Sequence, residues 1–412
     1  MDKLQNQRAV KWALFSLAIV ALYGTVMRYK IAFNFPYFEQ KHLLHAHSHF
    51  AFSGWVSHFI YAGLASVITP FLSGNRKKKY WFLLLANLFC AAGMLIAFTV
   101  QGYKAVSIGF STLSIVQSIW FTCVFMKDSR LLPAGHPSLS WAKTGLLLNV
   151  VSAAGPLYLG YMMATHHINQ QIYLAAVYYY LHFQYNGWFF FGCMAIIVSH
   201  LPAGMPSLKR SFQLFAVAAI PTYLLSILWA KLPTWLYLFG LLAGLLQLGA
   251  WLVMLVKLAP VLKMKTREHW KSRSIYMILF YASAFALTLK FILQAVSAIP
   301  SLSQMVFGFR PVVIAYLHLV LLGVYSLFFI GYWVRYNYIL LTGFTRVAIL
   351  AFLAGVAFNE LLLALQGIGG FGAFAVPHIQ DYLFYTAVLL LVSSLSLALG
   401  NAITTRHLHK TA

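Results

Sequence analysis

The chain has 412 residues, of which 61% are hydrophobic and only 8% are charged. A soluble protein carries about 25% charged residues, so the composition excludes the soluble classes and indicates a polytopic membrane protein. The formal net charge of +23 would indicate a nucleic-acid partner in a soluble chain. Here Lys and Arg in cytoplasmic loops explain it better, so we expect the lipid bilayer as a partner and no nucleic acid. The three cysteines all lie in apolar segments and predict neither a disulfide framework nor a metal site.

Twelve segments are long and apolar enough to span a membrane, which takes about 20 residues as a helix. We therefore expect an all-α polytopic membrane protein with twelve transmembrane helices in a single domain. The first segment has no clear cleavage site after it, so we interpret it as a retained helix rather than a signal peptide. The segments cover roughly residues 10–28, 43–72, 80–101, 105–126, 141–164, 172–199, 211–230, 232–256, 273–298, 311–334, 344–366 and 380–402.

Positive charges divide unevenly between the two ends of these segments. If the N-terminus is cytoplasmic, 22 of the 29 Lys and Arg residues fall on the inner side. Positive residues concentrate on the cytoplasmic side of membrane proteins. We therefore predict an integral protein of a bacterial cytoplasmic membrane, with both termini in the cytoplasm.

Histidines cluster where the second segment begins, at His42, His45, His47 and His49. On a helix His42, His45 and His49 share one face, and His47 lies almost opposite. Imidazole is a common metal ligand and the usual axial ligand of haem iron. A histidine cluster that enters a membrane is costly unless it has a function there.

The sequence after His49 recurs twice at nearly equal intervals. Each copy has a histidine, then a glycine five residues later, then a large apolar residue, and the histidines are 133 and 136 residues apart. This regularity predicts a pseudo-threefold arrangement of three four-helix units, roughly 1–126, 127–256 and 257–402, followed by a tail, 403–412. The copies are His49-Phe-Ala-Phe-Ser-Gly54-Trp55, His182-Phe-Gln-Tyr-Asn-Gly187-Trp188 and His318-Leu-Val-Leu-Leu-Gly323-Val324.

Two charged residues lie inside apolar segments, Lys290 in the ninth and Glu360 in the eleventh. Because burying either charge alone is costly, we expect both side chains to face protein or water, near the histidines. Lys290 would then serve as a counter-charge for an anionic cofactor group or pair with Glu360, and Glu360 would carry protons.

The topology and the histidines on the second, sixth and tenth helices resemble subunit I of the haem–copper oxidases, a superfamily that includes nitric oxide reductases. They also resemble the twelve-helix haem- and copper-containing membrane proteins of the nitric oxide response. The closest local match besides the helix 2 histidines is Tyr316-Leu-His318-Leu. The resemblance implies that His49, or His45 one turn away, and His318 are axial ligands of a haem. It also implies copper or another transition metal near His182, and an electron-donor protein or quinol as partner.

The sequence departs from this family at three places. Tyr316 stands where the family has the first histidine of His-x-His, and the adjacent histidine pair between helices 7 and 8 is absent. The His-Pro-Glu-Val-Tyr signature of helix 6 is absent too. A single haem or metal site therefore fits better than a full binuclear centre. The candidate cofactor-binding residues are His45, His49, His318 and Lys290, and the candidate metal-binding residues are His47, His182, His166, His167 and Glu360.

Three classes of function remain open. The first is a haem-dependent redox protein that handles electrons or a diatomic gas such as O2 or NO. Its enzyme class would be a haem-dependent oxidoreductase. The second is a transporter of a metal cation or of protons that uses the outer histidines and Glu360. The third is a cofactor-free assembly protein. Secondary transporters usually show twofold repeats, so the threefold period favours the first class.

Overall fold

The computed structural model describes residues 3–33, 35–202, 207–264, 270–303, 309–370, 372, 374 and 376–411, and every regular element in them is a helix. This confirms the all-α expectation. Ten of the helical segments are long and apolar enough to cross a membrane, which makes the chain an integral membrane protein. They are Gln5–Ala32, Gln40–Phe71, Gly74–Gln101, Ala105–Leu131, Leu139–Ala164, Thr234–Pro260, Ile275–Val296, Arg310–Arg335, Gly343–Gly369 and Ile379–Thr404.

Two more of the expected spans are helical but are not among those ten. The first is a continuous helix made of α8 (Gln170–His182), η4 (Phe183–Trp188) and α9 (Phe189–Ser199), and its tyrosines and amides lower its hydropathy. The second begins as α10 (Lys209–Ala218) and continues as the 3₁₀ turns η5 (Pro221–Ser226) and η6 (Leu228–Ala230). Pro221 lacks the N–H that an α-helix needs, which explains the change of helix type.

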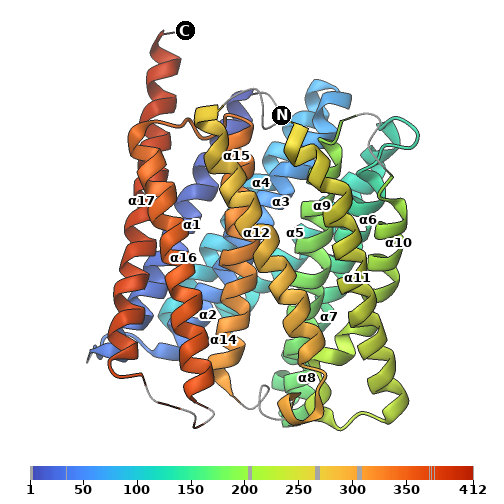
Figure 1. The fold of residues 1–412 in the computed structure, drawn as a ribbon, viewed down its shortest axis with the longest axis vertical. Helices are drawn as coiled ribbons and strands as arrows, with labels where there is room; N and C mark the ends of the chain where they lie inside the picture. The colour runs from blue at the N-terminus through green and yellow to red at the C-terminus, as the bar shows by residue number, and fades with distance from the viewer. Residues whose placement is uncertain are drawn as a thin grey trace. The chain divides into compact units, whose positions relative to one another are not determined.

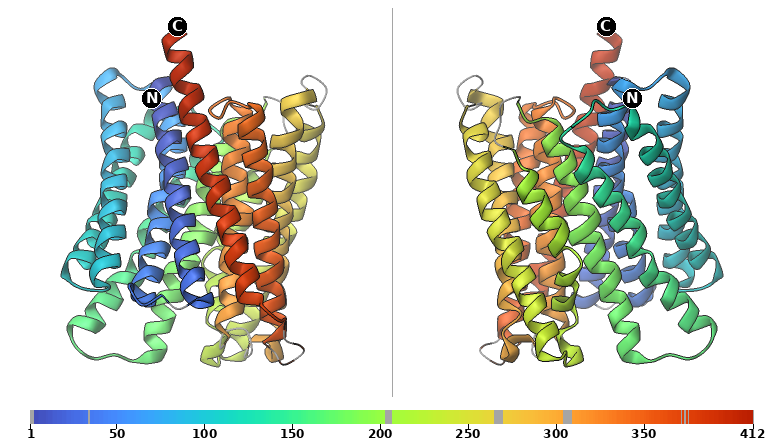
Figure 2. Two further views of the ribbon diagram at one scale, coloured as in Figure 1. Left: turned by 90° about the vertical axis from the view of Figure 1, so that its left-hand side faces the viewer. Right: turned by 90° about the vertical axis from the view of Figure 1, so that its right-hand side faces the viewer.

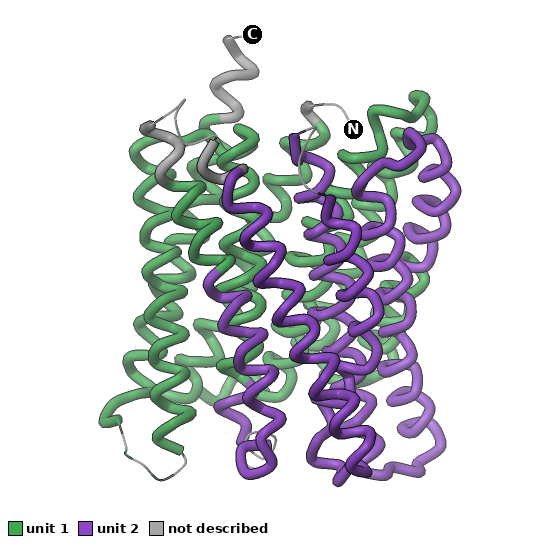
Figure 3. The backbone as a smooth tube through the Cα atoms, turned by 45° about the vertical axis from the view of Figure 1, so that its right-hand side comes forward, with its two compact units in different colours: residues 1–117, 269–284, 314–412 green, residues 118–268, 285–313 purple. Residues whose placement is uncertain are grey.

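The chain forms two compact units, shown in Figure 3. Unit 1 contains residues 1–117, 269–284 and 314–412, and unit 2 contains residues 118–268 and 285–313. The boundaries pass through α5 (Ala105–Asp128), α12 (Trp270–Val296) and α14 (Arg310–His318). The remaining helices of unit 1 are α1 (Lys3–Ala32), α2 (Gln40–Phe50), η1 (Ala51–Ser57), α3 (His58–Ile68), η2 (Thr69–Phe71), α4 (Gly74–Gln101), η8 (Leu319–Ser326), α15 (Leu327–Arg335), α16 (Gly343–Gly369) and α17 (Ile379–Thr411).

Unit 1 brings together helices from both ends of the sequence. Helix α1 packs along α17, and α17 packs along α16 (Figures 1 and 2). Helix α2 contacts both α1 and α4. The N-terminus and the C-terminus lie at the same end of this unit (Figure 1). The histidine-rich α2 is therefore enclosed by neighbours in a unit that the two ends of the chain complete.

Unit 2 also contains η3 (Ser129–Leu131), α6 (Leu139–Ser152), α7 (Ala154–Ala164) and α11 (Thr234–Met264). Helix α6 contacts η4 and α9, and α10 contacts α11. Gly187 permits one of these contacts, because a Cβ atom there would lie 2.9 Å from the Cβ atom of Leu148. Helices approach closely where a glycine lacks a side chain, and Gly187 is such a point.

Candidate functional site

Each of the three repeated histidines stands at the start of a π-helical segment. His49 lies two residues before η1, and His182 and His318 immediately precede η4 and η8. Well under 1% of residues in proteins are π-helical, and such segments occur frequently at functional sites. The three copies of the sequence repeat therefore share one local structure, a π-helical segment that begins at or just after the histidine.

Two of the π segments are joined to each other inside unit 1. The indole Nε1 of Trp55 in η1 donates a hydrogen bond of 2.8 Å to Oγ of Ser326 in η8, and both residues are buried. One turn further on, the rings of Phe59 and Phe329 stack with centroids 3.6 Å apart. These contacts join the segments that follow α2 and α14, the two helices that carry the histidines.

His47 and His318 have the same hydrogen-bonding pattern. Nδ1 of His47 lies 3.0 Å from the carbonyl oxygen of Val20, and Nδ1 of His318 lies 2.8 Å from that of Ile314. A carbonyl oxygen can only accept, so each Nδ1 carries the proton and each Nε2 keeps its lone pair. Neither Nε2 makes a hydrogen bond with the described residues. Each neutral imidazole can therefore bind a metal through the lone pair of its Nε2.

Helix α1 places a glycine and an arginine beside these imidazoles. His47 and His318 are close enough to interact electrostatically, and Arg28 of α1 interacts with both. Arg28 makes no ion pair or hydrogen bond within the described part of the chain. Gly24, one turn before Arg28, faces His47: a Cβ atom there would lie 3.5 Å from Cε1 of the ring. The pair is half-buried and has an uncompensated cation beside it.

The opposite face of α2 carries the other three histidines and points at the turn between α4 and α5. Nε2 of His49 lies 2.9 Å from the hydroxyl of Tyr103, and its ring stacks on Phe98 with centroids 4.5 Å apart. The ring of His45 packs edge-on against Tyr103 at 4.5 Å, and its buried Nε2 has no hydrogen-bond partner among the residues that the structure describes. The electrostatic neighbour of His318 is therefore His47, whereas the sequence had favoured His49 or His45. Which histidine binds a ligand stays a prediction.

His182 belongs to a different environment, a polar network in unit 2. Its Nε2 lies 2.8 Å from the carbonyl oxygen of Ala219, and its Nδ1 lies 3.0 Å from Nδ2 of Asn186. Lys290 is buried in the same network, where its Nζ donates to Asn186 Oδ1 and, at 2.7 Å, to Gln294 Oε1. The structure thus joins Lys290 to His182, and both nitrogens of His182 are already engaged.

No protein-family model matches the sequence, and no curated protein matches it. The site must therefore be interpreted from its own geometry.

The remaining candidate residues are Glu360, His166 and His167. Glu360 is half-buried and accepts a hydrogen bond of 3.1 Å from its neighbour Asn359. His166 adopts a left-handed backbone with φ of 57° in the turn after α7, and Nδ1 of His167 lies 2.7 Å from the carbonyl oxygen of Thr165. Both histidines are exposed. Over the ranges that the structure describes, no group of three or more His, Cys, Asp or Glu side chains is arranged to hold a metal ion.

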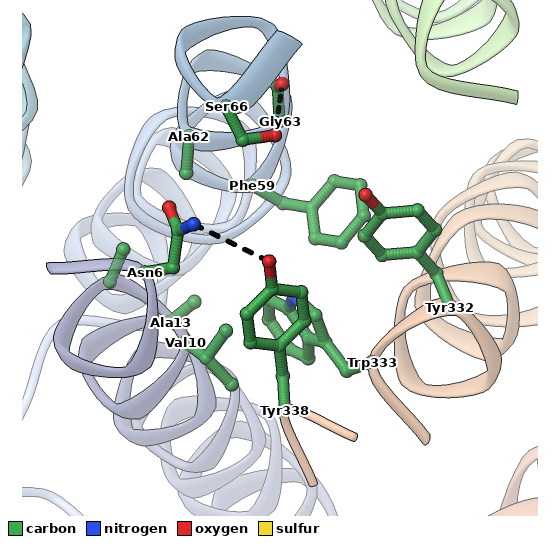
Figure 4. Close-up of a pocket in the computed structure, with 11 residues that line it drawn as sticks. Asn6, Val10, Ala13, Phe59, Ala62, Gly63, Ser66, Tyr332, Trp333 and Tyr338 are labelled. Carbon is green, nitrogen blue, oxygen red and sulfur yellow. Dashed lines mark hydrogen bonds between the residues drawn. The ribbon is translucent and has the colours of Figure 1, made fainter. Parts of the chain in front are cut away.

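A small cleft in unit 1, drawn in Figure 4, was not expected from the sequence. It encloses about 360 Å³ including open solvent, and it is lined by small and polar residues of α1 and α3 and by aromatic side chains of α3, α15 and the segment after α15. Nδ2 of Asn6 donates to the hydroxyl of Tyr338 across 3.4 Å (Figure 4). Burial raises the pKa of Tyr338. The lining comes from three separate parts of the chain, so no local motif could have revealed it.

Proposed function

We propose that the protein is a haem-binding membrane protein in which His47 and His318 supply the two axial ligands, and that it handles electrons or a diatomic gas such as O2 or NO. One observation carries this proposal. Two imidazoles on adjacent helices of one unit each bind a backbone carbonyl through Nδ1 and leave Nε2 available. A hydrogen bond from Nδ1 of this kind fixes the tautomer and the ring orientation of metal-binding histidines.

The residues around the pair also fit a macrocycle with anionic edge groups. Arg28 provides a guanidinium next to both imidazoles, and arginine binds carboxylates through two parallel hydrogen bonds. The chain has only six Asp and Glu residues against 29 Lys and Arg residues, so most of its positive charges have no acidic partner. Gly24 presents no side chain toward His47, which leaves room beside the ring. These features support haem better than a small metal ion, which would need more ligands.

Bound haem would supply a one-electron centre. The protein's own part is to hold the two imidazoles rigidly, because Val20 and Ile314 fix their Nδ1 protons and the Trp55–Ser326 bond fixes their helices. Hydrogen bonds to Nδ1 also raise the basicity of a ligating imidazole. Arg28 would set the charge next to the centre, and a nearby positive charge favours the electron-rich state.

We also propose that the protein has twelve spans. The two helical segments of unit 2 that fall outside the ten apolar spans would be the sixth and the seventh. The three π segments support three four-helix repeats, and the charge asymmetry supports cytoplasmic termini in a bacterial inner membrane. An electron-donor protein or a quinol would then be the partner.

A visible spectrum of the purified protein tests the proposal. We expect a Soret band and sharp reduced-state bands of low-spin haem. His47→Ala and His318→Ala should each abolish the low-spin spectrum, whereas His49→Ala should retain it. His167→Ala is the control for a histidine that is exposed in a turn. An unchanged spectrum in His47→Ala together with its loss in His49→Ala would move the ligand to the other face of α2. Protein purified without any haem after expression in haem-replete cells would reject the proposal.

A further inference from the structure

We infer that unit 2 contains a built cation-binding site, and that the ammonium group of Lys290 occupies it where the resemblance implies copper. Lys290 lies in the membrane-spanning part of α12 and is only 3% exposed. Its Nζ donates to Oδ1 of Asn186 and to Oε1 of Gln294, and it lies 4.1 Å from the centroid of the Phe291 ring. Two amide oxygens and one aromatic face are the groups that proteins use to replace the hydration of a buried cation.

The hydrogen bonds around Lys290 all run in one direction. An ammonium group can only donate, so the oxygens of Asn186 and Gln294 must face Nζ and their NH2 groups must point away from it. Asn186 Nδ2 then donates to Nδ1 of His182, which fixes the proton of His182 on Nε2. Gln294 Nε2 donates to Gln247 Oε1 over 3.1 Å. The negative ends of the two amide dipoles therefore converge on one point, which is an arrangement that stabilises positive charge.

Both arms of the network end at the same helix terminus. His182 Nε2 donates to the carbonyl oxygen of Ala219, the residue that caps α10. Gln247 Nε2 donates to Thr222 Oγ1, whose hydroxyl donates to the carbonyl oxygen of Ala218, the last residue of α10. The C-terminal end of a helix carries a partial negative charge. The C-terminal end of α10 thus directs carbonyl oxygens and a favourable dipole toward the network.

No carboxylate among the described residues of unit 2 pairs with this charge. In the described residues of unit 2 the only acid is Asp128, at the end of α5, and no ion pair joins it to Lys290. An unpaired ammonium in such a place is costly, so the amide oxygens, the ring and the helix terminus must offset that cost. The network is therefore specific for a positively charged group rather than for a side chain of a given volume.

The copper implied by the resemblance does not fit these residues. His182 has no free nitrogen, because one donates to Ala219 and the other accepts from Asn186. A metal ion there would also be repelled by the adjacent ammonium, which interacts electrostatically with His182. A mobile metal cation at His182, as the transporter hypothesis requires, meets the same obstacle.

Chemical rescue of a lysine-deleted variant tests the inference. In Lys290→Ala the missing atoms correspond to propylammonium, and 1-propanol is a neutral molecule with the same number of heavy atoms. At neutral pH the amine is charged, because alkylammonium groups titrate near pH 10.4, as lysine does. We expect Lys290→Ala to lower the thermal midpoint of the purified protein. Propylammonium should restore most of that loss and 1-propanol should restore little.

The control is Lys257→Ala in the same unit, where the lysine is only half-buried and donates to one backbone carbonyl, that of Ser207. Its midpoint should change little and should not respond to propylammonium. Equal rescue by propanol and propylammonium would show that the site recognises volume, which would overturn the inference.

A copper titration provides a second test that does not depend on a lysine variant. We expect wild-type protein and His182→Ala to bind the same amount of copper, because His182 has no nitrogen to offer. A copper ion bound by wild-type protein and lost in His182→Ala would overturn the assignment, whatever the outcome of the rescue.

Discussion

At the scale of single residues, the turn between α4 and α5 shows how tightly one face of α2 is fitted. Gly102 has a φ of 63°, a conformation that L side chains rarely adopt. A Cβ atom at this position would also lie 2.3 Å from Nε2 of His42. Backbone conformation and the imidazole of α2 therefore both require glycine at Gly102.

We predict that Gly102→Ala destabilises the protein by about 1–3 kcal/mol, the range for a strained backbone position. The matched control is Gly109→Ala in α5, where no atom lies within 4 Å of the added Cβ. Alanine in a helix is more stable than glycine by roughly 0.5–1 kcal/mol, so this variant should be neutral or slightly stabilised. Denaturation midpoints of the two variants check the prediction, and equal effects would contradict it.

At the scale of elements, the π segments decide how α2 and α14 are aligned. A π segment changes the rotation of the helix, so side chains before and after it face directions that a regular α-helix would not give them. In unit 1 the consequence is that Trp55 and Ser326 meet within their π segments, while His47 and His318 approach each other before those segments begin. The hydrogen bond between the segments is therefore the clamp that positions the two imidazoles.

Ser326→Ala should remove this clamp. It leaves the indole N–H of buried Trp55 without its acceptor, which costs about 1–3 kcal/mol. We also expect a broadened low-spin spectrum in haem-loaded protein, because the helices that carry the ligands lose their register. Ser111→Ala is the control, since its hydroxyl bonds only to a carbonyl of its own helix, that of Ser107, at 2.9 Å. If both variants behaved alike in stability and spectrum, the clamp would have no such role.

At the scale of the whole molecule, the two termini belong to the same unit and lie at the same end of it (Figure 2). We predict that reporter tags on the N-terminus and the C-terminus report the same side of the membrane, and that this side is the cytoplasm. The positive charges at inner loops give the physical reason. Proteolysis of tags in spheroplasts and in inverted vesicles measures it. Tags on opposite sides would require an odd number of spans.

The sequence by itself determined the class of the protein, its helical content and most of its spans. Hydropathy and charge act residue by residue along the chain, because each segment meets lipid or water directly, so they can be evaluated without knowing any neighbour. Local pattern also located the three histidines that start the π segments and the buried Lys290. It did not reveal that two of the expected spans in unit 2 differ from the others. Tyrosines and amides lower the hydropathy of one, and Pro221 ends the α-helix of the other.

Only the tertiary structure decided which groups meet. His47 and His49 are two residues apart on α2 but face opposite sides, and the packing of that helix against α1 and α4 determines which one approaches His318. The network of Lys290 joins four helical segments that are distant in the sequence, and no local pattern reports such a meeting. Rotation of a helix about its axis depends on all of its neighbours at once, which is why the pairing of side chains became visible only in the folded protein.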